Sequence, residues 1–183
     1  MDTQGELRRA AKSLRKAERA LARAMSYQEK KETQNIVPEV VRVNSAYNIG
    51  KYLITNGEYL DFVTKTGHRA PSHWVDGQVP EGKLRHPVVN VSYRDAVAYC
   101  KWLSSVSGRK FRLPTGDEWT LAATGGDDRE YPWGNEKPNP KLCNFDFSVC
   151  DTTPVGSYPD GASPCGAQDM SGNVWEYTTE VAK

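Results

Sequence analysis

Three histidines and four cysteines are the side chains of this sequence best suited to bind a transition metal or to act as nucleophiles. His68 and His73 lie on either side of a proline, and His86 precedes another. This spacing gives neither the i, i+4 pair of a helical metal site nor a facial triad. We therefore expect the histidines to lie unengaged in polar loops.

The cysteines contain no C-x-x-C pair, which argues against a zinc site. Cys143, Cys150 and Cys165 cluster in a loop-rich region, whereas Cys100 lies in an expected helix. A disulfide among the clustered three would stabilise that region by about 2 to 4 kcal/mol. Reduced, half-buried thiols are the expectation for a cytoplasmic chain. The sequence also has no phosphate-binding glycine loop with its lysine and no nucleophile elbow.

Three expected helix starts share one local pattern, a hydroxyl residue three positions before a carboxylate. The pairs are Thr55 and Glu58, Ser92 and Asp95, and Thr115 and Glu118. This pattern predicts capping boxes, in which the hydroxyl accepts from the amide three residues on and the carboxylate reaches back. The predicted helices cover residues 58–66, 95–106 and 116–124, and glycines 67, 108 and 125 stand where they should end.

Residues 6–32 are predicted to form one more helix, because they are rich in Ala, Leu, Arg, Lys and Glu and contain no Gly or Pro. Leu7, Leu14 and Leu21 recur every seven residues, as in a heptad seam. Such a seam packs either on the protein's own body or on a second helix, by self-association or on another subunit. Both alternatives stay open.

The net charge of +1 conceals an asymmetry between the two parts of the chain. Residues 1–31 carry nine Lys or Arg against four Asp or Glu, so a basic segment precedes an acidic body. A charge run of this size is more typical of a solvated helix face than of a nucleic-acid site. No membrane span or secretory segment is expected, which favours synthesis in the cytoplasm.

The predicted organisation is therefore a basic heptad-patterned helix and linker over residues 1–35, followed by one folded domain over residues 36–183. Val40, Val41 and Val43 indicate a strand at the start of this domain. From Gly125 to Gly172 the sequence is rich in Gly, Pro, Asp and Asn, which predicts a long functional or ligand-stabilised loop.

Three unusual motifs occur in order: Arg112–Trp119 (RLPTGDEW), Tyr131–Asn135 (YPWGN) and Asp169–Tyr177 (DMSGNVWEY). Together with four further stretches they resemble the formylglycine-generating enzyme family, which includes the sulfatase-modifying factors. The further stretches are residues 50–59, 86–92, 95–100 and 153–157. The resemblance extends from about Val37 to Tyr177.

The resemblance implies an α+β fold of the C-type-lectin-like kind, with few short strands and much loop. Such a fold serves oxidases, iron-dependent sulfur chemistry and binding proteins, so the motifs indicate fold more than activity. We expect them to act as scaffold, with Arg112 paired to a carboxylate such as Glu118 or Asp95.

Family members that bind calcium use oxygen ligands from the Gly-Asn-x-Trp-Glu region and from an earlier Asn, and oxygen-only ligands suit Ca²⁺. The implied ligands are the side chains of Asp169 and Glu176, the carbonyls of Gly172 and Val174, and, for a second site, Asn144 with the Phe145 carbonyl. In the alternative interpretation, the two carboxylates only satisfy backbone amides in a turn.

Family enzymes place the cysteine pair that holds copper and attacks the substrate after the Trp-Glu motif. Only Thr178 to Lys183 follow that motif here. On this basis no catalytic role is assigned to the cysteines, and no catalytic copper or iron is expected.

These observations lead us to expect a non-enzymatic structural or binding module in a larger assembly, such as a phage virion decoration, neck or adhesin protein. Its protein contacts, including those of a homo-oligomer, would use the N-terminal helix and an open strand edge near Val40–Val43. One alternative is a formylglycine-generating oxidase of a substrate cysteine, completed by a missing segment or a partner. The other is a calcium-dependent glycan binder.

Overall fold

The structure is a computed structural model that describes residues 37–146 and 148–179. The predicted N-terminal helix lies outside the described residues, and the predicted domain boundary stays a prediction. The described elements are β1 (Val40–Arg42), β2 (Asn48–Gly50), α2 (Asn56–Thr66), η1 (Val75–Gly77), α3 (Tyr93–Ser107), α4 (Gly116–Thr124) and η2 (Pro159–Gly161). No helix among these residues is long and apolar enough to cross a membrane.

All three predicted capping boxes are present. In each, the hydroxyl residue accepts from the amide three positions later and the carboxylate binds back to the cap. Helices α2 and α3 begin at Asn56 and Tyr93, two residues before the predicted starts, because the helix continues from its cap. The predicted glycines cap the C-terminal ends in the left-handed conformation.

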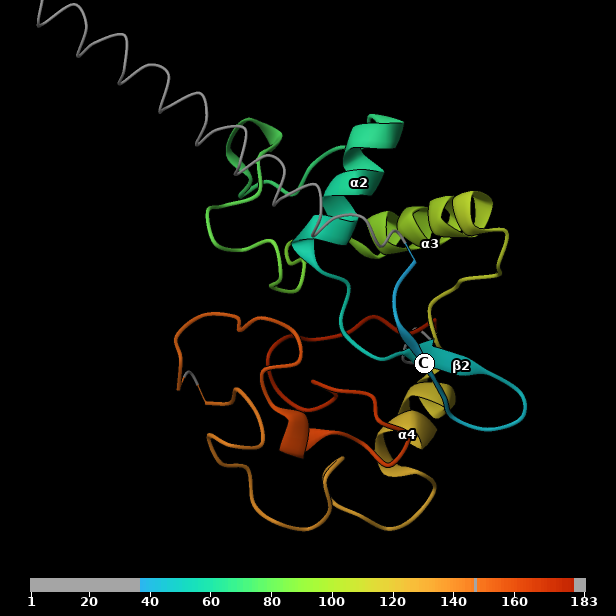
Figure 1. The fold of residues 1–183 in the computed structure, drawn as a ribbon, viewed down its shortest axis with the longest axis vertical. Helices are drawn as coiled ribbons and strands as arrows, with labels where there is room; N and C mark the ends of the chain where they lie inside the picture. The colour runs from blue at the N-terminus through green and yellow to red at the C-terminus, as the bar shows by residue number, and fades with distance from the viewer. Residues whose placement is uncertain (1–36, 147, 180–183) are drawn as a thin grey trace, which may run out of the picture. The chain divides into compact units, whose positions relative to one another are not determined.

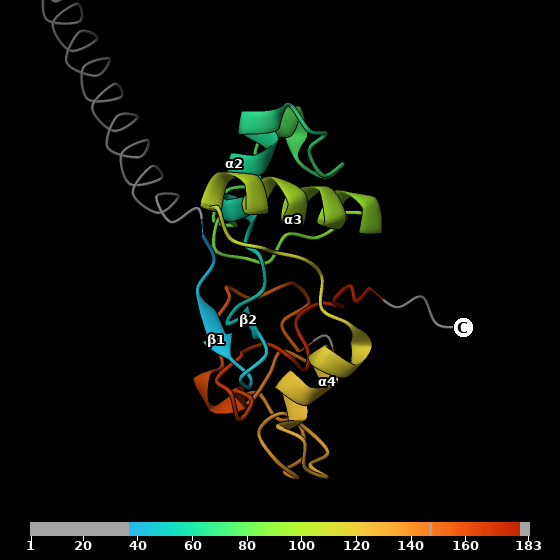
Figure 2. The same cartoon turned by 90° about the vertical axis from the view of Figure 1, so that its right-hand side faces the viewer.

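Helices α2 and α3 pack against each other at a crossing angle (Figures 1 and 2). Their buried aromatic side chains form one core. Tyr59 and Phe62 are one turn apart on α2, and Tyr99 and Trp102 are one turn apart on α3, so each pair shares a face. The Tyr59 and Tyr99 rings stack at 5.7 Å between centroids. Burying aromatic rings of this size is the main stabilising term for this half of the domain.

A second core lies under α4, in the half of the domain that also contains β1 and β2 (Figure 2). Ala122 and Ala123 of α4 pack against Ala167 and Met170, with Val41 and Ile49 of the hairpin beside them. Small alanines let the chain after residue 165 approach the helix closely. The C-terminal motif is therefore held against α4.

Strands β1 and β2 form an antiparallel hairpin in which Val41 is opposite Ile49. The predicted strand at Val40–Val43 is thus present, but it is not left unpaired, because the chain turns back at Asn44 to supply β2. The sheet has two strands among the described residues. Its other edges have no strand partner within this part of the chain.

The region from Gly125 to Gly172 is loop, as predicted, apart from the single turn η2 and an isolated bridge between Tyr131 and Gly134. Tyr131 and Trp133 stack in parallel at 5.2 Å between centroids. The Trp133 indole donates to the Glu136 carbonyl at 2.9 Å. The second of the three motifs therefore stabilises its own loop.

Candidate functional site

The Asp169–Tyr177 motif forms a turn that lies against the loop after Leu142. The backbone N–H of Asn173 donates to the Asn144 carbonyl at 2.9 Å. Gly172 has φ +92, and a Cβ at this position would collide with the same carbonyl. Backbone packing thus requires a glycine at position 172. The hydrogen bond of Asn173 brings the two predicted sets of calcium ligands together.

Asp169 is buried, and its Oδ2 accepts from the Gly156 amide at 3.1 Å. Burial raises the pKa of Asp169, and the Gly156 bond opposes this increase. The backbone of Asp169 lies at φ +59, a left-handed conformation that is uncommon for a residue other than Gly. This carboxylate does satisfy a backbone amide, as the alternative interpretation expected.

Glu176 differs from Asp169 because it lines an open cavity. The residue has accessible surface, yet protein atoms around the carboxyl group raise its pKa to about 7, and the negative charge of Asp169 adds to this effect. The indole N–H of Trp119 acts in the opposite direction and lowers the pKa of Glu176. This N–H is buried, and it does not reach hydrogen-bond geometry with any group of the described chain. Glu176 is therefore a carboxyl group that titrates near neutral pH.

The members of the predicted second calcium site are partly occupied by protein contacts. The Asn144 side chain donates to the Asp151 carbonyl at 2.8 Å. The Phe145 carbonyl accepts from the Ser148 amide at 2.9 Å. In the first set, the Gly172 carbonyl accepts from the Val174 amide at 2.8 Å, and a carbonyl in such a turn keeps a second lone pair.

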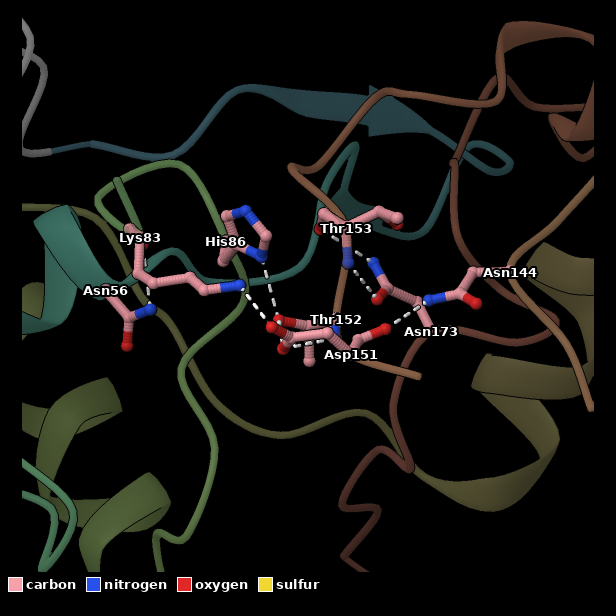
Figure 3. A network of polar contacts seen from close by, with 8 residues as sticks. All are labelled: Asn56, Lys83, His86, Asn144, Asp151, Thr152, Thr153 and Asn173. Carbon is pink, nitrogen blue, oxygen red and sulfur yellow. Dashed lines mark hydrogen bonds and ion pairs between the residues drawn. The ribbon is translucent and has the colours of Figure 1, made fainter. Parts of the chain in front are cut away.

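Figure 3 shows a polar network that connects the loop around Asp151 to the segment before Pro87. Pro87 forms an isolated β-bridge with Thr55. Lys83 Nζ lies 2.6 Å from Asp151 Oδ2, and the His86 Nδ1 lies 2.8 Å from Thr152 Oγ1. Burial, together with the charge of Lys83, lowers the pKa of His86. The network stabilises the loop rather than offering open ligands.

The expectation of unengaged histidines is wrong for all three, and His73 Nδ1 lies 3.3 Å from Asn90 Nδ2. His68 Nε2 lies 2.8 Å from Asp95 Oδ1, and its ring packs on Phe62 at 4.7 Å between centroids. His86 is buried in the network described above. Both residues are fixed by partners distant in sequence, which spacing alone does not reveal.

The Arg112 guanidinium binds both carboxylate oxygens of Glu118, at 2.6 and 2.7 Å, and the same carboxylate completes the α4 capping box. The predicted Arg–carboxylate pair is thus confirmed with Glu118, whereas Asp95 pairs with His68. These bonds, led by Arg112, lower the pKa of Glu118 to about 2.

The described residues do not fit a copper or iron centre. They contain no group of three or more His, Cys, Asp or Glu that could hold a metal ion. The Cys100, Cys143 and Cys165 thiols are free, and burial raises the pKa of Cys100 and Cys143, which disfavours the thiolate that a metal needs. Cys165 instead lies 3.4 Å from the Ala122 carbonyl.

The largest feature that sequence reasoning missed is a cavity of about 1050 Å³ beside Glu176. Its walls come from β2, α3 and two extended stretches, residues 87–91 and 109–114. Residues 173–177 line one side. The Arg112–Trp119 and Asp169–Tyr177 motifs both contribute lining residues, among them Glu118 and Glu176, but no sequence pattern indicated that they surround a cavity.

Comparison with known proteins identifies the family. The sequence profile of the sulfatase-modifying factor enzyme 1-like domain matches residues 9–183. The chain belongs to this family. The resemblance expected from the three motifs is therefore confirmed, and with it a fold of three helices, two short strands and much loop in the described residues.

Three members and relatives of the sulfatase-modifying factor enzyme 1-like family are close enough to inform function. Hercynine oxygenase of Mycobacterium tuberculosis is 36% identical over 165 residues, which is 73% of this chain and 37% of that protein. The formylglycine-generating enzyme of Thermomonospora curvata is 32% identical over 74% of this chain and 60% of its own length. The solved structure of PvdO from Pseudomonas aeruginosa superposes with a TM-score of 0.62 at 28% identity, covering 74% of this chain and 57% of PvdO.

The chain thus spans between about a third and three fifths of the proteins that it matches. The expectation of a non-enzymatic structural module is wrong, because the proteins of similar sequence include hercynine oxygenases and formylglycine-generating enzymes. Nothing in the comparisons supports a virion role. The non-enzymatic expectation was based on the few residues that follow Trp175. Where a given sequence stops is no evidence about activity.

Proposed function

We propose that this chain is part of an oxygen-dependent oxidising enzyme and that its substrate is hercynine. The observation that supports this proposal most is the 36% identity to hercynine oxygenase, which extends over 165 residues and 73% of the chain. Two further hercynine oxygenases match the same share at 33% and 30% identity.

A second candidate is formylglycine generation on a substrate cysteine. It is favoured by the Thermomonospora curvata enzyme, of which this chain covers 60%, a larger share than of any hercynine oxygenase named above. The family also contains proteins named as inactive formylglycine-generating enzymes, so turnover has to be measured.

Hercynine oxygenases use iron and formylglycine-generating enzymes use copper. Because the described residues hold no suitable cluster, we assign the metal ligands to polypeptide outside them. In this proposal the described part supplies the rigid scaffold and the cavity beside Glu176. The metal, when bound elsewhere in the enzyme, supplies the activation of oxygen.

Chimeric enzymes test the proposal and separate its two candidates. In one, the matched stretch of the Mycobacterium tuberculosis hercynine oxygenase is replaced by that of this chain; in the other, the Thermomonospora curvata enzyme receives it. Each chimera is assayed in the complete reaction mixture in which its parent turns over, including any co-substrate or reductant that the parent requires. We expect the first chimera, with iron, to consume hercynine and oxygen, and the second to leave a Cys-x-Pro-x-Arg peptide unchanged. Circular dichroism and thermal melting establish that each chimera folds.

A folded first chimera that does not oxidise hercynine would refute the hercynine proposal. If the second chimera, with copper, converts the peptide cysteine to an aldehyde, the formylglycine candidate replaces it. Each parent enzyme, assayed in parallel, gives the reference rate.

We also propose that Ca²⁺ binds at the Asp169–Tyr177 turn, through the Asp169 and Glu176 carboxylates and the Gly172 and Val174 carbonyls. Two carboxyl groups whose pKa values are both raised gain most from a bound cation. A second ion at Asn144 and Phe145 has less support, because the Asn144 amide and the Phe145 carbonyl already have partners.

A further inference from the structure

The cavity beside Glu176 is large and mostly apolar. Its volume of about 1050 Å³ matches the upper end of the range for small-molecule sites, which is about 300 to 1,000 Å³. Buried and half-buried apolar side chains from segments far apart in sequence line it, among them Leu53, Ile54, Val88, Leu103, Phe111 and Met170. A ligand with a long apolar part would remove most of this surface from water.

One wall of the cavity is the stretch of residues 109–114, which runs from the end of α3 to the beginning of α4 (Figure 2). Hydrogen bonds hold it in two places. The Phe111 amide donates to Ser104 Oγ of α3 at 2.8 Å, and the Pro114 carbonyl accepts from the Thr179 amide at 2.8 Å. The wall therefore has an α3 end and an α4 end, both fixed by the fold.

Two cations line the cavity at the α3 end. Arg109 and Lys110 are exposed and follow the C-cap of α3 directly. The Arg109 guanidinium lies 5.3 Å from the centroid of the Phe111 ring, which keeps it beside the apolar lining. Within residues 37–146 and 148–179, neither Arg109 nor Lys110 forms an ion pair. An anionic group of a ligand can therefore approach both cations without displacing a carboxylate of this part of the chain.

The other charged groups of the lining do not offset these two cations. Arg112 and Glu118 neutralise each other, at 2.6 Å. Glu176 belongs to the α4 end, because Trp119 of α4 and Asp169 are the side chains that influence its pKa. Its charge there is reduced by the proton that it holds near neutral pH, or by the calcium ion proposed above. The positive charge at the α3 end thus stays available to a ligand.

We propose that this cavity binds a free long-chain carboxylate, with the alkyl chain along the apolar lining and the carboxylate at Arg109 and Lys110. Burial of the alkyl chain supplies the affinity, and the two cations supply the selectivity for an anionic head group. This ligand is additional to the substrate of the proposed oxidation. The inference therefore stands or falls without any measurement of turnover.

Isothermal titration calorimetry of the complete 183-residue chain with laurate tests the inference. Each probe is used below its solubility limit and critical micelle concentration, and a chelator removes calcium, which would otherwise precipitate the carboxylate. We expect one laurate to bind per chain. Dodecanol and dodecylamine keep the alkyl chain but have no negative charge, whereas acetate keeps only the carboxylate. Each of these three should bind at least tenfold more weakly than laurate.

Hydrogen exchange locates the ligand, and phosphatidylglycerol vesicles test the other source of an acyl chain with an anionic head group. Laurate should slow the exchange of amides at residues 88–91 and 109–113, because both stretches line the cavity. We expect the chain not to co-sediment with the vesicles, because the proposed ligand is the free carboxylate.

Two double variants identify the head-group site. Arg109→Gln with Lys110→Gln should weaken laurate binding at least tenfold and leave dodecanol binding unchanged. Both side chains are exposed, so circular dichroism should show an intact fold. Arg94→Gln with Lys101→Gln is the matched control, since it removes one Arg and one Lys from exposed positions of α3 that do not line the cavity. The control should bind laurate as the wild type does.

The inference is overturned if laurate does not bind, if dodecanol or dodecylamine binds as tightly, or if the Arg109 and Lys110 double variant binds like the control. Binding that leaves exchange at residues 88–91 and 109–113 unchanged would overturn it by placing the ligand elsewhere. Binding to vesicles without binding of free laurate would overturn it in favour of a membrane surface. A chain that binds laurate as expected, while its chimera oxidises no hercynine, would contradict only the proposed function.

Discussion

The backbone N–H of Asn173 lies 2.9 Å from the carbonyl of Asn144, and this hydrogen bond fixes the turn that carries Glu176 to the loop after Leu142. The Asn173 side chain extends the connection, because its Oδ1 accepts from the Thr153 amide at 2.9 Å. A single residue thus joins three segments. The position of Glu176 in the cavity depends on this junction.

Gly172→Ala should destabilise the domain by about 2 kcal/mol or more, because φ is +92 and the new Cβ would collide with the Asn144 carbonyl. Gly82→Ala is the matched control, since Gly82 has φ +74 but nothing within 4 Å, and should cost about 1 kcal/mol. Urea unfolding measures both. Equal losses would mean that close packing at Asn144 is unimportant.

Arg112→Lys should reduce stability by about 1 kcal/mol at neutral pH, because a lysine replaces the two-pronged contact with Glu118 by a single one. Lys137→Gln, at an exposed pair with Glu130, should leave the free energy of unfolding unchanged within error. A double-mutant cycle with Glu118→Gln checks the coupling. No coupling at Arg112 would contradict this account of the motif.

The domain without bound cation should lose stability as the pH rises from about 5 to 8, through the contribution of Glu176. Its folded pKa of about 7 lies above the ordinary carboxyl value of 4.5, so the folded state holds the proton more strongly in this window. Glu176→Gln should remove this loss and melt higher than the wild type at pH 8.

The comparison of Glu176→Gln with the wild type is needed because His86 acts in the opposite direction. The pKa of His86 in the folded state is below 6.5. The stability that its neutral imidazole contributes is therefore lost as the pH falls through this folded-state pKa. The difference between the two melting curves isolates Glu176. A difference that does not vary with pH would show that Glu176 has an ordinary pKa.

Calcium should raise the melting temperature at pH 8 and have little effect at pH 5, where Glu176 is protonated. Chelation should reverse the increase. Asp169→Asn should abolish the effect, whereas Asp76→Asn, at an exposed turn, should preserve it. An equal response of both variants would place the ion elsewhere.

Local features of this fold could be predicted from sequence, because their physics acts within a few residues. The three capping boxes, their glycines and the Arg112–Glu118 pair are all present. The hairpin partner of the first strand was missed, since β2 is only three residues long and has no strong alternation.

The cavity and the contacts of the histidines depend on long-range packing. His68 meets Asp95 across α2 and α3, and Glu176 approaches Trp119 only because the chain after residue 165 packs under α4. No spacing in the sequence reports these distances. The calcium ligands, the protein partners and the cytoplasmic location stay predictions.

The most direct measurement of the central claim is mass spectrometry of hercynine after incubation with the iron-loaded chimera that carries the matched stretch of this chain. The account predicts an oxidised product that forms under oxygen, is absent under nitrogen and accumulates within about a hundredfold of the parent rate. A folded, iron-loaded chimera that leaves hercynine unchanged under oxygen, in the complete mixture in which the parent enzyme oxidises it, would contradict the account.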